Sequence, residues 1–469
     1  MKTARHIFAL ICYVCFFNLP GLSAQDNRQR FPDIEKRDQE LPIPPTSFVP
    51  QDTEPDKTIT IDMKDDSEVY LGNGVVYKGF VIDDKIPGPT FTCEEGEVIE
   101  WVVKNSGSRP HGLSIHAAYT QTSEYLGNIA PGEEASVVFR ATYPGVYMYH
   151  CAPAGHATPM HTLLGQYGMI VVKPKQKYRL EEVLEKDPDL EIYLLQHEFY
   201  ANGKDAVEGQ GKPMYVAFNG QPFRYVRDPI KGRPGDYVRI YFMNAGPNLL
   251  STLHLVGIVW DYAYWQGNPE NILTGGQTVT SGPSDTWVVE FRIPPDEGDY
   301  TIVTHAFGSA SKGAIGILNA QEDADRTTPE LADGPVYTEN EWEELREDIK
   351  RTISPFEPGS KDVDPVKKYP PGTSEITVQI IGNSYYPKVI EVEPGTEVTW
   401  INEDVFPFLE GEFSGAHDVF VIDGPEPFRS PMLKHAESYT HTFTEEGEYE
   451  YICSPHPYMK GIVKVKERD

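Results

Sequence analysis

From Thr58 onward, apolar and polar residues alternate in short runs along the chain. The runs Val98–Val103, Ser136–Arg140 and Met169–Val172 show this alternation, and proline and glycine separate such runs. A period of two is typical of strands that bury one face, and closely spaced strands of this kind are typical of β-sandwiches. The pattern therefore predicts an all-β chain.

One pair of strand motifs occurs three times. The first motif ends in an asparagine, and a Gly-x-Tyr strand follows later in each copy. The pairs are Glu95–Asn105 with Gly145–Tyr147, Pro234–Asn244 with Gly298–Tyr300, and Pro394–Asn402 with Gly447–Tyr449. A repeated strand pattern indicates repeated domains. We predict three β-sandwich domains at residues 58–174, 175–320 and 373–469.

The N-terminus has the features of an export signal. Lys2 and Arg5 precede an apolar run at Ile7–Phe17, and small residues follow at 21–24. This order predicts a secretory signal peptide over residues 1–24, because the run is too short to span a bilayer. We expect no membrane anchor and a periplasmic or secreted protein. Residues 25–57 are polar and proline-rich, which predicts an extended or disordered leader.

Residues 321–372 are acidic and contain prolines, which is typical of a linker. Within them, Thr338–Thr352 has a capping box of Thr338 and Glu341 followed by an apolar stripe of Trp342, Leu345 and Ile349. This pattern predicts a short amphipathic helix before the third domain.

Charge and cysteine content narrow the function. The formal net charge is −30, which argues against nucleic acid and anionic membranes and favours basic partners. Cys12 and Cys15 lie in the signal peptide, so Cys93, Cys151 and Cys453 remain. Three dispersed cysteines do not form a disulfide framework, so we expect metal ligands or buried thiols. Cys93, in the predicted strand Thr90–Glu94, is expected to be a buried free thiol.

Two potential ligands are neighbours within the stretch Tyr147–Gln166. His150 and Cys151 end an alternating strand, and neighbouring strand residues point to opposite faces. If both bind metal, they serve two centres joined by one peptide bond. A thiolate with imidazoles is typical of an electron-transfer copper site, whereas imidazoles with an open position suit chemistry on a small molecule.

The third domain carries the residues of a thiolate copper site. They are His417, Cys453, His456 and Met459. Two histidines, a cysteine and an axial methionine are the ligands of blue copper. The loop from Cys453 to Met459 closely resembles that of amicyanin, a small electron-transfer cupredoxin.

The first domain offers ligands for both kinds of site. His111 and His116 are an odd number of residues apart, so on a strand they face opposite ways. Cys151 and His161 would complete a thiolate site with His111, whereas His116 and His150 begin an all-imidazole site that lacks a ligand. The second domain offers His305 and His254 for that place. It has no cysteine, and Thr304 stands where the other domains have theirs.

With these motifs, residues 58–320 resemble copper-containing nitrite reductase. The resemblance implies tandem Greek-key cupredoxin domains in a homotrimer, with type 1 copper at His111, Cys151 and His161. It also implies a catalytic type 2 copper at His116 and His150, with His305 given by the adjacent subunit. The third domain resembles that of extended family members, in which it acts as an on-board electron donor.

Three positions depart from the family. The axial methionine falls on Gln166, whose amide oxygen usually lowers the copper potential. The loop from Cys151 to His161 is one residue longer, so Met160 as axial ligand or His156 as imidazole remains open. Ser114 and Val259 stand where the family has the aspartate and histidine that deliver protons. Such groups contribute about 10²–10⁴-fold in rate, and a serine is no acid at neutral pH.

The leading hypothesis is a periplasmic copper reductase that converts nitrite to nitric oxide, with two type 1 coppers and one type 2 copper per chain. Its electron donor would be a cytochrome c or a cupredoxin. The alternatives are another small nitrogen or oxygen substrate, or a multi-copper electron-transfer or copper-binding protein without catalysis. A three-copper oxidase needs His-x-His pairs, which the sequence lacks. His254, His197, His435 and His441 are interpreted as core, surface or supporting residues.

Overall fold

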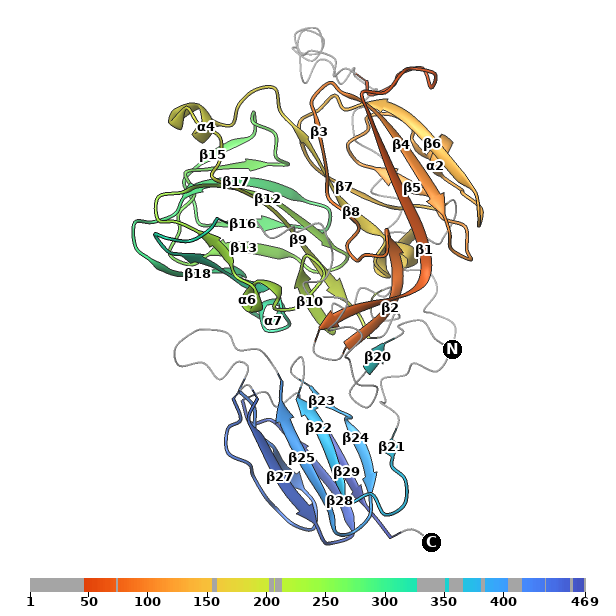
Figure 1. Ribbon diagram of the computed structural model, residues 1–469, viewed down its shortest axis with the longest axis vertical. Helices are drawn as coiled ribbons and strands as arrows, with labels where there is room; N and C mark the ends of the chain where they lie inside the picture. The colour runs from red at the N-terminus through yellow and green to blue at the C-terminus, as the bar shows by residue number, and fades with distance from the viewer. Residues whose placement is uncertain are drawn as a thin grey trace, which may run out of the picture. The chain divides into compact units, whose positions relative to one another are not determined.

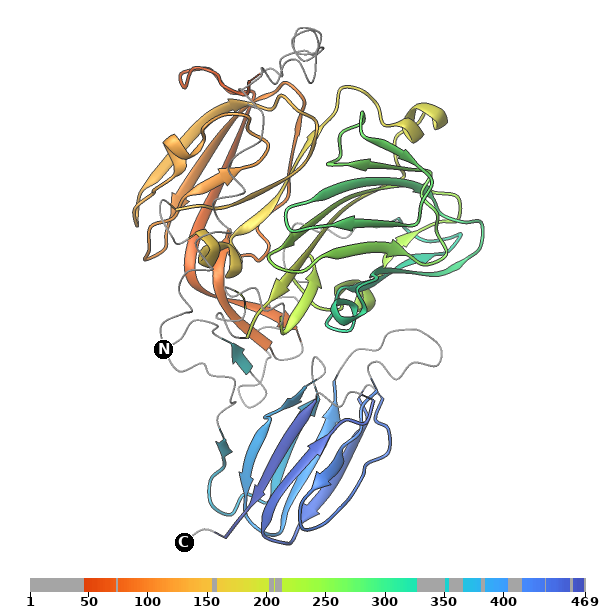
Figure 2. The same cartoon turned by 180° about the vertical axis from the view of Figure 1, so that it is seen from behind.

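The structure is a computed structural model. It describes residues 46–72, 75–153, 158–201, 206, 213–326, 351–353, 366–380, 384–403, 416–434, 436–455 and 459–467. The chain divides into two compact units, Met1–Thr46 and Ser47–Asp469, and the architecture below belongs to the second. The predicted signal peptide lies outside the described residues. Strands form three pairs of sheets, drawn in red to yellow, in green and in blue in Figures 1 and 2.

The first pair of sheets has the strand orders β20-β2-β1-β4-β6 and β3-β8-β7-β5. The runs predicted from alternation fall within β4, β6 and β8, and their inward residues pack around Trp101 and Tyr149. The elements are β1 (Lys57–Gly72), β2 (Val75–Ile82), β3 (Phe91–Glu94), β4 (Val98–Asn105), β5 (Leu113–Ile115), α2 (Ser123–Leu126), β6 (Glu134–Arg140), β7 (Gly145–Cys151), α3 (Thr158–Leu163) and β8 (Tyr167–Lys173).

The second pair has the orders β10-β9-β12-β17-β14-β15 and β11-β19-β18-β13-β16. Its elements are α4 (Arg179–Leu184), β9 (Leu190–Phe199), β10 (Tyr215–Phe218), α6 (Arg224–Arg227), β11 (Ile230–Gly232), β12 (Tyr237–Gly246), β13 (Ser251–Leu255), β14 (Tyr262–Trp265), β15 (Ile272–Thr274), β16 (Thr278–Ser281), β17 (Thr286–Arg292), β18 (Gly298–Thr304), α7 (Phe307–Ala310) and β19 (Ile315–Ala320).

The third pair has the orders β21-β24-β29-β28-β26 and β23-β22-β25-β27. Its strands are β21 (Lys367–Lys368), β22 (Glu375–Ile380), β23 (Tyr385–Tyr386), β24 (Val389–Val392), β25 (Thr396–Asn402), β26 (Phe420–Asp423), β27 (Ser438–Phe443), β28 (Gly447–Ile452) and β29 (Lys460–Val465). The all-β sandwich class predicted from the sequence is confirmed, whereas the exact domain bounds stay predictions.

The repeated asparagine has the same job in each pair of sheets. Asn105 and Asn402 end their strands, and Asn244 lies two residues before the end of its strand; each strand pairs in parallel with the first long strand of its own sheet. The Nδ2 atoms of the three asparagines donate to the carbonyl oxygens of Ile129 (2.8 Å), Ser281 (3.0 Å) and Leu433 (2.8 Å) respectively. The Ile129 and Leu433 carbonyls also accept the backbone N–H groups of His111 (3.0 Å) and His417 (3.0 Å), so the asparagine adds a second bond to a carbonyl that is already paired. The repeated asparagine therefore anchors one neighbouring backbone segment in each of the three sandwiches.

A buried histidine joins the first two pairs of sheets. His197 in β9 is wholly buried, and both ring nitrogens are engaged. The Gly220 N–H donates to Nε2 (3.0 Å), so the neutral ring carries its proton on Nδ1 and donates it to the Tyr167 hydroxyl in β8 (2.7 Å). Residues of both pairs pack around this contact in one shared core, which includes Tyr77, Met148 and Phe199.

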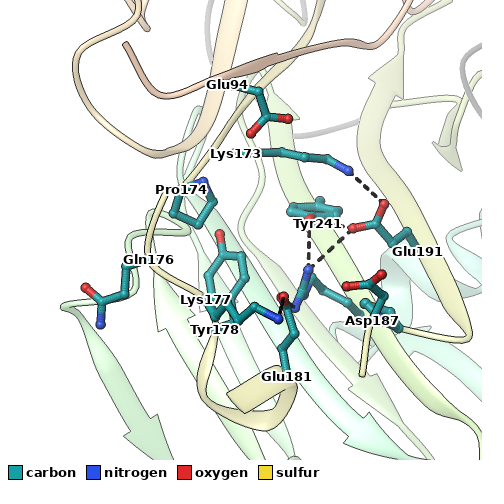
Figure 3. Close-up of a pocket in the computed structure, with 12 residues that line it drawn as sticks. Glu94, Lys173, Pro174, Gln176, Lys177, Tyr178, Glu181, Asp187, Glu191 and Tyr241 are labelled. Atoms are coloured by element: carbon teal, nitrogen blue, oxygen red, sulfur yellow. Dashed lines mark hydrogen bonds and ion pairs between the residues drawn. The ribbon is translucent and has the colours of Figure 1, made fainter. Parts of the chain in front are cut away.

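A charged cluster lies at the same junction (Figure 3). The Arg239 guanidinium is 6% exposed and pairs with Glu181 (2.7 Å), Glu191 (3.4 Å) and Glu290 (3.0 Å). Lys173 from β8 reaches Glu191 (2.9 Å) across a cavity of about 350 Å³. Because these charges satisfy one another, we interpret the cluster as structural: it ties α4 and the end of β8 to the second sandwich.

Three local expectations can be compared with the structure. Cys93 is a buried free thiol, as predicted. Residues 338–350 of the predicted helix lie outside the described residues, but Arg351 and Thr352 belong to strand β20 (Arg351–Ile353), so the predicted C-terminal end of the helix is wrong. These residues pair in parallel with Val75–Tyr77 of β2, and sheet pairing overrides the local helical pattern. The predicted leader extends one residue too far, since β1 begins at Lys57.

None of the helices in the described part of the chain is long and apolar enough to cross a membrane.

The His197 contact predicts acid sensitivity. Burial lowers the pKa of His197 to about 3, against about 6.5 when unfolded. The unfolded state therefore binds the proton first, and this stability is lost as the pH falls below about 6.5, by up to about 1.4 kcal/mol per pH unit. We expect His197→Gln to lower the thermal unfolding temperature at pH 7.5. The difference from wild type should narrow towards pH 4.5; a constant difference would exclude His197 as the titrating group.

Candidate metal centres

Strand β7 ends on the two adjacent residues singled out in the sequence. The Cys151 side chain is fully buried, whereas His150 is partly exposed. β7 lies between β8 and β5, with Leu113 opposite Cys151 and Ser114 opposite His150. Directly paired residues share a face of the sheet. The buried face therefore carries the thiol and the other face carries the imidazole.

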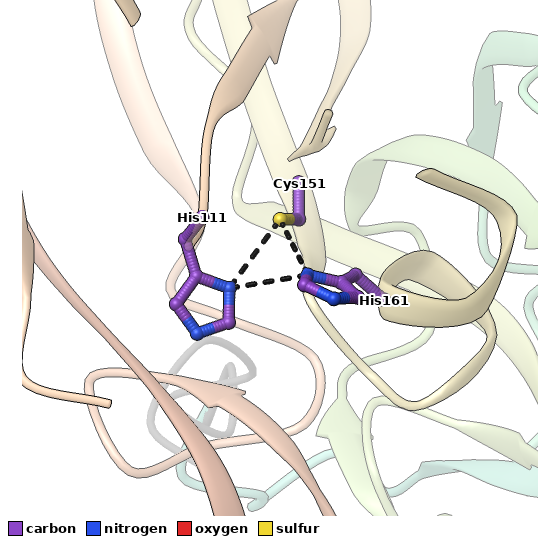
Figure 4. A group of neighbouring side chains, drawn as sticks. All are labelled: His111, Cys151 and His161. Atoms are coloured by element: carbon purple, nitrogen blue, oxygen red, sulfur yellow. Dashed lines mark hydrogen bonds between the residues drawn. The ribbon is translucent and has the colours of Figure 1, made fainter. Parts of the chain in front are cut away.

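His111, Cys151 and His161 come together on the buried side (Figure 4). The Cys151 Sγ lies 3.6 Å from His111 Nδ1 and 3.3 Å from His161 Nδ1, and the two Nδ1 atoms are 3.2 Å apart. In the described part of the chain, no other group of three His, Cys, Asp or Glu side chains has its ligand atoms as close. Phe80 packs edge-on against both rings.

Gln166 presents a free oxygen in this region. The Cys151 N–H donates to the Gln166 carbonyl (2.9 Å), which places the two residues side by side. The Gln166 Nε2 donates to the carbonyls of Lys64 (3.1 Å) and Val81 (3.3 Å), which fixes the orientation of the amide. Among the described residues, the buried Oε1 has no hydrogen-bond partner, although Gln166 lies close enough to His111 to act on the pKa of that imidazole in the upward direction. A buried acceptor without a partner is costly.

These donors fit copper. Two imidazoles, a thiol and an amide oxygen are the set that holds an electron-transfer copper, and a metal there would give the Gln166 Oε1 a partner. Met160 and His156 are the alternative ligands predicted from the sequence. Met160 is 41% exposed, and His156 lies outside the described residues. The geometry therefore favours Gln166 over Met160 and places His161 beside Cys151, and the alternative of His156 stays a prediction.

The third sandwich repeats the arrangement. The Cys453 N–H donates to the Met459 carbonyl (3.3 Å), just as the Cys151 N–H donates to Gln166, so Met459 and Gln166 hold the same place beside their cysteines. The Cys453 Sγ is 3.6 Å from His417 Nδ1, and all three side chains are buried. His456 lies outside the described residues.

The second sandwich keeps the register but not the ligands. Leu253 pairs with Thr304 as Leu113 pairs with Cys151, so Ser251 and Thr304 hold the places of His111 and Cys151. The Thr304 N–H donates to Ala314 (3.2 Å), which therefore stands where Gln166 does. A serine, a threonine and an alanine cannot make a thiolate copper site.

A pair of imidazoles occupies the other face of β7. The Nε2 atoms of His116 and His150 are 3.1 Å apart. Their Nδ1 atoms face away: that of His150 is 2.9 Å from the Cys151 carbonyl, and that of His116 is 3.1 Å from the Ser284 hydroxyl. Both Nε2 atoms are thus aimed at one point, where a metal with two imidazole ligands fits.

Burial sets the protonation of these groups. It lowers the pKa of His161 and of His116 to about 4, helped in each case by the neighbouring histidine, and it lowers those of His111 and His150. These imidazoles are neutral ligands at pH 7. Burial raises the pKa of the Cys151 thiol to about 12, so a metal must displace its proton on binding.

The remaining sequence candidates lie apart from these groups. His305 is exposed, with its ring 5.3 Å from that of His254, and within one chain it does not join His116 and His150. Val259 is 67% exposed. Ser114 is partly exposed opposite His150. Of the other histidines, His441 stacks on Phe428 at 3.8 Å, which fits a packing role.

Sequence reasoning missed two supporting residues. Ser284 contacts His116 although it lies in a different sandwich, and it has a φ of +68°, which is unusual for a residue other than glycine. Asp65 lies 3.5 Å from the His111 Nε2. Neither stands in a motif, so only the fold could reveal them.

Comparisons with known proteins agree with this geometry. Residues 374–466 match the family described as copper binding proteins of the plastocyanin/azurin family, and residues 65–177 match the multicopper oxidase family. A copper-containing nitrite reductase from Neisseria meningitidis serogroup A is 33% identical over 283 residues, which cover 56% of this chain and 70% of the relative.

Solved structures give the same result. The Cu-containing nitrite reductase (NirK) from Thermus scotoductus SA-01 is 50% identical with a TM-score of 0.61, covering 88% of this chain and all of that chain. The copper nitrite reductase from Nitrosomonas europaea is 33% identical with a TM-score of 0.53, covering 59% of this chain and 98% of that chain.

The place of Gln166 can be tested by exchanging axial side chains. We expect Gln166→Met to raise the reduction potential of copper bound at Cys151, because a thioether favours Cu(I) more than an amide oxygen does. A shift of about 59 mV in the reduction potential changes the oxidised-to-reduced ratio tenfold, and spectroelectrochemistry should resolve a shift of this size. Met459→Gln is the matched control and should shift the other centre downwards. An unmoved potential in Gln166→Met, with a shift in Met160→Leu, would make Met160 the axial ligand.

The strained backbone at Ser284 allows a separate test. We expect both Ser284→Ala and Ser284→Gly to weaken copper binding at His116 by about 10–100-fold, because the ring loses its hydroxyl partner. Only the glycine variant should also unfold at a higher temperature, since glycine adopts positive φ without strain. Chelator competition and thermal unfolding measure the two effects. Wild-type copper affinity in the glycine variant would contradict the supporting role.

Proposed function

Because the chain belongs to the copper-containing nitrite reductase family, we propose that it reduces nitrite to nitric oxide in the periplasm. The reaction takes one electron and two protons per nitrite and releases one water. The observation that carries the proposal is the Cys151–His150 junction, which joins a buried thiol site to an imidazole site through one peptide bond.

Copper, when bound, supplies one-electron chemistry at the thiol site and Lewis-acid binding of substrate at the imidazole site. The chain supplies the connection between them. The His150 Nδ1 lies 2.9 Å from the Cys151 carbonyl, so a hydrogen bond parallels the covalent path. The Thr162 hydroxyl donates to the same carbonyl (3.3 Å) and steadies this turn.

His116 is exposed and His150 is partly exposed, so the imidazole pair can be reached from another copy of the chain. We propose that His305 of a neighbouring subunit completes the site in a homotrimer. Its exposure supports this role, since a ligand offered to a neighbour must lie on the surface. Each chain would then hold two type 1 coppers and one type 2 copper.

Proton supply is where this chain departs from the family. Ser114 lies opposite His150 and its hydroxyl can relay a proton, but it is no acid at neutral pH. Val259 has no titratable group. We propose that both protons come from solvent water, with the Ser114 hydroxyl as the relay.

The third sandwich would act as an on-board electron donor to the first. Its site, formed by His417, Cys453 and Met459 with His456 from the loop, would accept electrons from a periplasmic cytochrome c or cupredoxin. The net charge of −30 favours a basic donor.

Nitric oxide production from nitrite tests the proposal. The copper-loaded full chain, given a chemical reductant without oxygen, should form one nitric oxide per nitrite consumed. His116→Ala should abolish turnover, whereas His441→Gln, which alters a histidine that stacks on Phe428 in the third sandwich, should not. Ser114→Asp should raise turnover, because general acid catalysis contributes about 10²–10⁴-fold where it is present.

Absence of nitric oxide from protein whose thiolate coppers can be reduced would contradict the proposal. Turnover of another small nitrogen or oxygen species at His116 would then indicate a different substrate. Loss of all turnover with the copper retained would indicate an electron-transfer or copper-binding protein.

A further inference from the structure

Asp65 is a buried carboxylate beneath the loop that leads to His111. It stands in β1 where the pairing with β2 is irregular, between Lys64 and Ser67, and its side chain is 1% exposed. The Oδ1 accepts the backbone N–H groups of Ser108 (2.5 Å) and Arg109 (3.4 Å), and the Oδ2 accepts the Ser108 hydroxyl (2.6 Å). The Arg109 guanidinium also reaches the Oδ2 (2.5 Å).

The same carboxylate faces the copper-ligand candidate His111. Its Oδ1 lies 3.5 Å from the His111 Nε2, which is buried and has no hydrogen-bond partner among the described residues. The ring's other nitrogen, Nδ1, is the one that faces Cys151. Gly107 allows this approach, because a Cβ there would lie 2.0 Å from the Asp65 Oδ1 and 3.0 Å from the His111 Nε2.

In the first sandwich, Asp65 both binds the loop before His111 and faces the His111 ring. The second sandwich has the first of these contacts without the second. Gln196 pairs with Asn244 as Met63 pairs with Asn105, so Glu198 stands two residues further on, where Asp65 does. Its Oε1 accepts the N–H groups of Asn248 (3.1 Å) and Leu249 (2.8 Å). These residues precede Ser251 by three and two positions, as Ser108 and Arg109 precede His111.

The first two sandwiches therefore share this clamp, and in the second it occurs where no thiolate site exists. What is particular to the first sandwich is that the clamping carboxylate also faces an imidazole. A carboxylate behind a ligating histidine fixes its tautomer and adds negative charge near the metal.

We propose that Asp65 is a positioning residue for the copper site of His111, Cys151 and His161, and that its charge lowers the reduction potential of that site. The inference rests on copper binding at these residues, as proposed above. The negative charge 3.5 Å from Nε2 favours the tautomer of His111 that carries its proton on Nε2, which leaves Nδ1 to face Cys151. Because reduction removes one positive charge from the site, a fixed anion favours the oxidised form.

The test measures the potentials of both thiolate sites in the copper-loaded full chain by spectroelectrochemistry, without nitrite. Asp65→Asn keeps the shape and an acceptor for Ser108 but removes the charge. We expect it to lower the oxidised-to-reduced ratio of the first site about tenfold at a fixed potential, an upward shift of about 59 mV. The Cys453 site should not move. Asp65→Glu, which keeps the charge, should restore much of the wild-type value.

Glu198→Gln is the matched control, because it alters the equivalent clamp where no imidazole is involved. It should leave both potentials unchanged. Equal potentials in wild type and Asp65→Asn, with a normal thiolate–copper absorption band, would overturn the inference. Asp65→Asn could bind copper too weakly for its potential to be measured. In that case, a wild-type potential in Asp65→Glu supports the role of the charge. Copper binding in Asp65→Glu that is as weak as in Asp65→Asn overturns the inference. Failure of nitrite turnover would leave these potentials readable, so the two proposals can fail separately.

Discussion

The alternation of side chains along one strand is the constraint on which the candidate chemistry depends. Because neighbouring residues of β7 point to opposite faces, Cys151 enters the core while His150 turns towards solvent. No loop could hold two such different environments one peptide apart with the same rigidity. The neighbouring strands β5 and β8 fix β7 on both sides, so the distance between the two sites is a property of the backbone.

The thiol site and the imidazole pair differ in how far their surroundings bury them. The thiol site is closed: its side chains are buried, and Phe80 packs against both imidazoles. Close packing of this kind limits rearrangement of the side chains that would hold a metal. The imidazole pair is more open, since His116 is exposed and His150 is partly exposed. Its supports come from two sandwiches, Thr162 from the first and Ser284 from the second, so the site depends on the junction at which His197 and Arg239 also lie.

Much of this could be predicted from the sequence, because it depends on local periodicity. The alternating runs gave the all-β class, and the odd separation of His111 and His116 indicated that they serve opposite faces. The structure also shows contacts between distant residues, which the periodicity of the sequence cannot predict. Asp65 and Ser284 reach their histidines across 46 and 168 positions of sequence, respectively, through the register of the sheets. The predicted C-terminal end of the helix is wrong for a related reason, since Arg351 and Thr352 pair with a strand that is distant in sequence.

The second sandwich carries a wider consequence. It holds Ser251, Thr304 and Ala314 where the first holds His111, Cys151 and Gln166, and yet its strands keep the same register and its asparagine clamp is intact. The second sandwich is therefore maintained by its core and its hydrogen bonds, without the thiolate ligands of the first. The same register can thus be built with or without these ligands, so the fold itself does not require the side chains that would hold a metal.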